Sequence, residues 1–132
     1  MSNDASSTDF LEVTLPDGNI IKAEIAMDKA QGLQNRDYLC PKCGMIFIFD
    51  TEGIYSFWMK DTLLDLSLIW INKKREVVHI ERNAKPCKYK TDPRKECQVY
   101  MPNINAKYVL EILPGASDSI NIGSVLKFIP PG

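Results

Sequence analysis

Alternation of apolar and polar side chains is the feature that most constrains the fold of this 132-residue chain. In residues 10–15 and 21–25 the apolar side chains occur at every second position, which is the period of a strand with one buried face. Pro16, Asp17 and Gly18 follow the first segment, and this turn chemistry predicts that the two segments form a β-hairpin. The chain is therefore expected to be built mainly from strands.

Similar short segments continue this pattern along the rest of the chain. Strands are predicted at residues 45–49, 54–59, 66–71, 76–81, 106–113 and 125–129. One short helix is expected at about residues 28–38, where Asp28 can accept hydrogen bonds from the free N–H groups at the helix start. The predicted fold class is mainly β: a single-domain antiparallel β-sandwich or barrel of about eight strands. Residues 1–9 are expected to be a flexible tail, and residues 10–132 the domain.

Composition and charge argue against several classes of partner. The formal net charge is −1, with −6 in the first 66 residues and +5 in the remainder. Basic residues cluster in 73–75 and 82–95, but only Tyr89 is interleaved with them, so nucleic-acid binding is not expected. No apolar run approaches the roughly 20 residues of a transmembrane helix, and residues 1–9 lack the features of a signal peptide. The compartment stays open: extracytoplasmic if a leader has been removed, and cytoplasmic otherwise.

The four cysteines form two pairs with different spacing. Cys40 and Cys43 are separated by two residues, as in one half of a zinc ribbon, whereas Cys87 and Cys97 lie nine residues apart in a long irregular loop. Three alternatives remain open: one zinc site made by all four, one or two disulfides, or free thiols. A thioredoxin-like catalytic pair is not expected, because that motif opens a helix and Cys40 and Cys43 precede a predicted strand.

A polar and aromatic cluster follows the predicted strand at residues 54–59. Strand alternation places Trp58, Lys60 and Thr62 on one face, where an ammonium, a flat apolar wall and a hydroxyl can bind a carboxylate, a phosphate or a sugar. The alternative is that Trp58 packs in the core and Lys60 pairs with Asp61 or Asp65. The candidate ligand-binding residues are Arg36, Trp58, Lys60, Thr62 and Asp65.

Several segments together are similar to motifs of the DUF192 (UPF0127) family. They are Gly32 and Leu33 with Arg36, then residues 44–49 (GMIFIF), 57–62 (FWMKDT), 64–66, 85–87 and 108–112, and Gly115. The resemblance covers about residues 11–128, and FWMKDT is its most specific part. It implies a small β-sandwich or barrel with one short helix, with no characterised biochemical role. The candidate ligand-binding residues all fall at motif positions.

The resemblance also separates the two cysteine pairs. Many members of the family look exported and carry a pair like Cys87 and Cys97, which implies a disulfide in that loop. Cys40 and Cys43 lie where the family usually has no cysteine, so no role is implied for them. Asp61 stands where the family usually has Asn, which replaces an amide donor with a carboxylate.

These observations lead to three hypotheses about function. The first is a non-enzymatic β domain that binds a small polar ligand or a protein partner around residues 57–62. The second is a structural or interaction module stabilised by zinc, the only cofactor considered, on Cys40, Cys43, Cys87 and Cys97. The third is a hydrolase-like enzyme that uses Asp61 or Asp65 as a general base.

Overall fold

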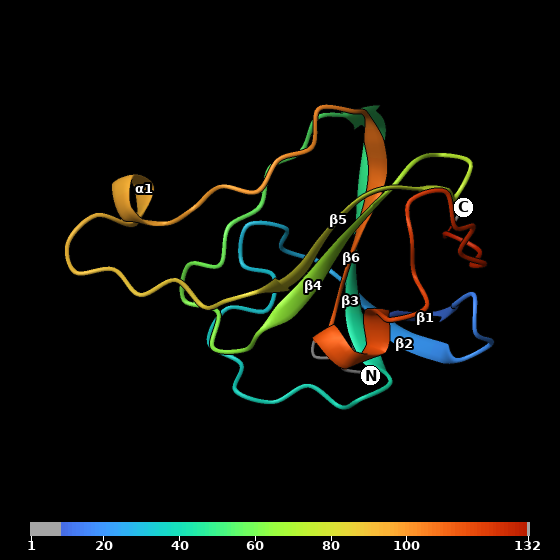
Figure 1. The fold of residues 1–132 in the computed structure, drawn as a ribbon, viewed down its shortest axis with the longest axis horizontal. Coiled ribbons are helices and arrows are strands. Elements are labelled where there is room, and N and C mark those ends of the chain that lie inside the picture. Colours follow the sequence, from blue (N-terminus) through green and yellow to red (C-terminus); the bar gives the residue numbers. More distant parts are fainter. Residues whose placement is uncertain (1–8, 132) are drawn as a thin grey trace, which may run out of the picture.

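Six strands form one sheet in the computed structural model, which describes residues 9–131 (Figure 1). They are β1 (Phe10–Thr14), β2 (Ile20–Ile25), β3 (Cys43–Gly53), β4 (Leu66–Ile71), β5 (Val77–Ala84) and β6 (Ala106–Ile112). Their order in the sheet is β1-β2-β3-β6-β4-β5, and β2 and β3 are the one parallel pair. The predicted mainly β class is confirmed, as is the predicted hairpin, which β1 and β2 form, and β4 and β5 also pair as antiparallel neighbours.

The strand count and the closure of the sheet differ from the prediction. The described residues contain six strands rather than about eight, and their single sheet does not close into a barrel. Residues 54–59 and 125–129 make only isolated bridges, among them Phe57 with Tyr100 and Lys127 with Thr14. Phe57 and Phe128 instead pack onto the two faces of the sheet, so these segments cover it and do not extend it.

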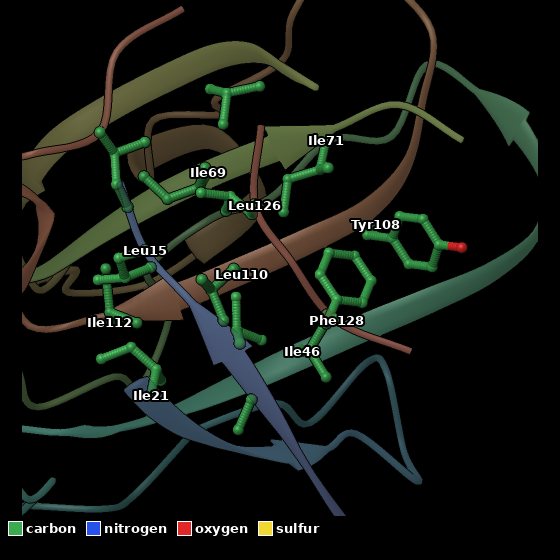
Figure 2. Close-up of a cluster of buried hydrophobic side chains, with 14 residues drawn as sticks. Leu15, Ile21, Ile46, Ile69, Ile71, Tyr108, Leu110, Ile112, Leu126 and Phe128 are labelled. Carbon is green, nitrogen blue, oxygen red and sulfur yellow. The ribbon is translucent and has the colours of Figure 1, made fainter. Parts of the chain in front are cut away.

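Alternation along the central strands produces a core on each face. One face is covered by the C-terminal segment, whose Leu126 and Phe128 pack with Ile46, Ile69 and Leu110 (Figure 2). The other face carries the alternate residues of the same strands, and the cluster there contains Phe47, Leu68, Trp70 and Val109. Because connecting segments cover it, we call this second face the loop face.

The segment predicted to be helical contains a series of turns. Asp28 accepts hydrogen bonds from the N–H groups of Ala30 and Gln31, as expected at a helix start. Gly32 and Asn35 then adopt φ of +51° and +65°, and left-handed residues cannot continue a right-handed helix. The predicted helix at 28–38 is therefore wrong. The one α-helix among residues 9–131 is α1 (Pro93–Glu96), in the long loop that extends from the sheet in Figure 1.

Two further predictions concern the ends of the chain and the membrane. Residues 1–8 of the predicted tail lie outside the described residues, and Asp9 accepts a backbone hydrogen bond from Ile25. Within residues 9–131, no helix has the length and apolar character needed to cross a membrane.

Gly44 lies where three strands meet, and substituting it is expected to destabilise the fold. A Cβ at this position would lie 2.7 Å from the backbone oxygen of Glu111 and 2.9 Å from Cγ2 of Ile112. The strands would have to separate, so Gly44→Ala should lower the free energy of unfolding by about 1–3 kcal/mol, as measured by urea denaturation. Gly115→Ala is the matched control, because a Cβ there meets nothing within 4 Å. Equal losses in the two variants would contradict this account.

Candidate functional site

The four cysteines form two separate disulfide bonds, Cys40–Cys43 and Cys87–Cys97. The first lies at the start of β3, and the second closes the loop that follows β5. With every sulfur bonded to another sulfur, no thiolate is left to bind a metal ion, and the zinc alternative is wrong for this structure. The disulfide that the family resemblance implied for Cys87 and Cys97 is present.

Three of the predicted ligand-binding residues pair with other charged side chains. Both guanidinium Nη atoms of Arg36 donate to Glu24, at 2.6 and 2.7 Å. Lys60 lies 3.0 Å from a carboxylate oxygen of Asp61. A salt bridge of 2.7 Å joins Asp65 to Lys85. These charges therefore do not converge on one point, and a ligand-binding role for Arg36, Lys60 and Asp65 stays a prediction.

The other two predicted residues, Trp58 and Thr62, line a cavity of about 400 Å³ on the loop face. Its wall is formed by the turns at residues 29–34, by β3, by residues 54–58 and by β6. The aromatic lining residues are Phe47, Phe49, Tyr55, Phe57 and Trp58. The polar lining residues are Lys29, Gln31, Gln34, Ser56, Thr62 and Glu111.

Ring contacts hold the aromatic wall in place. Phe49 and Tyr55 are stacked with their ring centroids 3.7 Å apart, and Phe47 meets Phe57 edge to face at 4.8 Å. The indole of Trp70 donates a 2.9 Å hydrogen bond to the backbone oxygen of Tyr55. Strand alternation on β3 directs Phe47 and Phe49 to the same face. The wall is thus fixed from both the sheet and the segment that covers it.

Glu111 is the charged residue buried at this site, and the sequence analysis did not single it out. It pairs in register with Met45 of β3 and Leu68 of β4, and its side chain is only 5% exposed. No other residue among 9–131 forms a hydrogen bond or salt bridge with its carboxyl group. Desolvation by burial raises its pKa to about 8. The available signal was an acidic residue between Leu110 and Ile112, in the part of β6 that is buried on both faces.

Gly32 brings the covering turns down onto this carboxyl group. A Cβ at Gly32 would lie 3.1 Å from Cζ of Phe47 and 4.0 Å from Oε1 of Glu111. The absence of a side chain, together with a positive φ, therefore lets the backbone pass close to both groups. The carboxyl group and the aromatic wall consequently belong to one site.

The comparisons with known proteins establish the family. The profile of DUF192, described as "Uncharacterized ACR", matches residues 13–128. The chain belongs to the DUF192 family. No curated protein matches its sequence significantly.

Two crystal structures share the DUF192 fold seen here. A protein of unknown function from Novosphingobium aromaticivorans DSM 12444 is 24% identical, with a TM-score of 0.76, and the match covers 96% of this chain and 91% of that one. A protein from Sinorhizobium meliloti 1021, described as "a putative transcription regulator", is 23% identical with a TM-score of 0.75, and the match covers 96% and 98%. At such identities the likeness shows the fold alone.

Four of the segments that resemble DUF192 motifs meet at the cavity. Gly32, Phe47, Trp58 and Glu111 come from four different motif segments, and all four residues line it. These segments are distant in the sequence, so the sheet and its covering loops bring them together. The cavity is therefore where the DUF192 motifs of this chain converge.

Asp61 precedes the lining residue Thr62 in the sequence and is not itself in the lining of the cavity. Its φ is +55°, a conformation that Asp and Asn tolerate better than most residues. The pKa of its carboxyl group is lowered by hydrogen bonds from Lys60 and from Tyr89, whose hydroxyl donates at 2.9 Å. A lowered pKa makes Asp61 a weaker general base near neutral pH, which counts against the hydrolase hypothesis.

Proposed function

We propose that this DUF192 domain binds a small molecule in the cavity on the loop face. The observation that carries the proposal is the carboxyl group of Glu111, which borders the cavity in a residue only 5% exposed and accepts no hydrogen bond from another side chain or backbone group among residues 9–131. A buried polar group without a partner costs free energy. A ligand group that pairs with Glu111 would offset this cost, whereas packing alone would favour an apolar side chain.

The shape and lining of the cavity support the same proposal. Its volume of about 400 Å³ is in the range of small-molecule sites, which are typically about 300–1,000 Å³. Such sites combine apolar and aromatic walls with a few polar groups that orient the ligand. In this assignment Trp58 forms part of the wall, and Thr62 and Glu111 orient the ligand. Lys60 is not in the lining, but its ammonium group lies 5.9 Å from the centroid of the Trp58 ring.

The two disulfides support an oxidising compartment as the place where this binding occurs. Structural disulfides persist in exported and extracellular proteins and are rare in reducing compartments. We therefore include an extracytoplasmic location in the proposal. The ligand would then be a molecule that the domain meets outside the cytoplasm.

Blocking the mouth of the cavity tests the proposed binding. Ser56 lines the cavity and is exposed, so Ser56→Trp should obstruct the space without disturbing the core. A library of monocyclic aromatic fragments, screened by saturation-transfer NMR, should give hits with the native protein that are lost with Ser56→Trp. The control is Asn103→Trp, at an exposed residue that does not line the cavity, and it should keep the hits. Binding that survives in all three proteins, or no binding to the native protein at millimolar concentration, would overturn the proposal.

A further inference from the structure

We propose that the cavity selects an organic cation, whose charge would lie between the carboxyl group of Glu111 and the aromatic rings of the wall. The inference rests on the proposed function and goes further by naming the class of ligand. A suitable ligand is a small molecule that has an ammonium group attached to an apolar or aromatic group.

The surroundings of Glu111 lack a positive partner of their own. Its neighbours on the adjacent strands, Met45 and Leu68, carry no charge, and Gly32 covers it from the turns. Lys29 and Tyr55 are the other titratable groups that line the cavity, and neither forms a salt bridge or hydrogen bond with Glu111. An ionised carboxylate in this setting has no salt bridge within the described residues, so a cation brought from outside would stabilise it.

The chain itself places an ammonium group on this aromatic wall. Nζ of Lys29, from the turns over the cavity, lies 5.7 Å from the centroid of the Phe49 ring. A cation within about 6 Å of a ring centroid is attracted by the negative face of the ring. Lys29 is exposed, and a lysine ammonium group sits on a flexible side chain. It can therefore move away from the Phe49 ring when another cation enters. The wall is thus suited to a cation, and Lys29 is its intramolecular competitor.

The other ligand classes fit the site less well. An anion would face the carboxyl group of Glu111 and would require it to stay protonated. A neutral ligand with a carbonyl group can accept a hydrogen bond from the protonated carboxyl group, but it would leave the proton on Glu111. A cation stabilises the ionised form, so its binding near neutral pH must release a proton from Glu111. A measurement of proton release on binding therefore distinguishes a cationic ligand from a neutral one.

Benzyltrimethylammonium is the direct probe, because its charge does not change with pH. It should bind about tenfold more tightly than benzyl alcohol, the neutral comparison, and benzoate should bind most weakly. Because the pKa of Glu111 is about 8, the affinity should rise by roughly tenfold per pH unit up to that pH. Calorimetry in two buffers of different ionisation enthalpy should show release of close to one proton at pH 6.

Two variants distinguish this inference from the proposed function. Glu111→Gln should remove the pH dependence of cation binding and most of the preference for the cation, while benzyl alcohol still binds. Lys29→Gln, a change at an exposed position, should tighten binding of the cation by a few-fold and change binding of benzyl alcohol by a smaller factor. A cation preference that is undiminished in Glu111→Gln, or that Lys29→Gln leaves unchanged, would overturn the inference. If Ser56→Trp nevertheless blocks the aromatic fragments, the proposed function stands without it.

Discussion

Replacing Glu111 by glutamine is expected to remove a pH-dependent loss of stability from the native protein. The pKa of Glu111 is about 8 in the fold and takes its ordinary value of 4.5 in the unfolded chain. Between these values the unfolded chain releases a proton that the folded protein keeps, so rising pH favours unfolding. The contribution of Glu111 is fully present below pH 4.5 and is lost as the pH rises to about 8. The loss amounts to roughly 4–5 kcal/mol, at about 1.4 kcal/mol per pH unit.

Urea denaturation between pH 4.5 and 9 measures this effect. The difference in the free energy of unfolding between Glu111→Gln and the native protein should grow steadily in favour of the variant and level off above pH 8. Other titrating groups contribute to both proteins and cancel in this difference. A constant difference over the whole range would show that the carboxyl group of Glu111 reaches water or a partner in the folded state.

Glu96 offers a control of opposite sign. Hydrogen bonds from the backbone N–H groups of Lys90, Asp92 and Thr91 lower the pKa of Glu96 to about 2. Its contribution to stability is therefore present above pH 4.5 and is lost as the pH falls towards 2. Glu96→Gln should differ from the native protein by a constant amount between pH 4.5 and 8, where Glu111→Gln changes most. The two profiles together assign the effect to burial of Glu111.

Local patterns in the sequence predicted those parts of the fold that local interactions determine. The β1–β2 hairpin follows from alternation and from the turn at Pro16, Asp17 and Gly18, where backbone bonds join Leu15 to both Gly18 and Asn19. The parallel pairing of β2 with β3 could not be predicted in this way. It joins segments separated by the turns at 28–35, and nothing in either strand specifies its direction.

The wrong prediction of a helix at residues 28–38 shows how a few backbone angles determine the conformation of a segment. Asp28 caps the first turn as expected, and a single glycine inside a helix costs only about 1 kcal/mol. Gly32 nevertheless adopts a positive φ, because its backbone crosses the edge of Phe47 and the carboxyl group of Glu111. That contact comes from the folded protein as a whole and is invisible in residues 28–38 alone.

The difference between local patterns and contacts of distant segments also explains which site residues could be predicted. Trp58 and Thr62 were found because the local motif is rich in aromatic and polar groups, and both line the cavity. Arg36 and Asp65 were grouped with them, but each has a salt bridge to a residue distant in sequence, Glu24 and Lys85. Glu111 was missed because its role depends on burial between β3 and β4, which only the sheet order reveals. A charged residue in a strand with two buried faces is the pattern to look for.

Removing the Cys87–Cys97 disulfide is expected to lower the free energy of unfolding by about 3 kcal/mol. The bond spans 10 residues of sequence, and its loss allows the unfolded chain more conformations. Cys97 is buried, so alanine is the appropriate replacement at both positions. Urea denaturation of Cys87→Ala/Cys97→Ala should show a lower midpoint and a larger m value, because the unfolded chain exposes more surface without the cross-link.

The Cys40–Cys43 disulfide is the matched comparison, because its two cysteines have a sequence separation of only 3. Its removal in Cys40→Ala/Cys43→Ala should cost about 2 kcal/mol, with a smaller change in the m value, since less freedom is gained by the unfolded chain. Which of the two variants loses more free energy of unfolding tests the explanation by the entropy of the unfolded chain. If the shorter loop proved the more stabilising, the Cys40–Cys43 bond would be acting on the folded state at the start of β3, and chain entropy would not be the dominant cause.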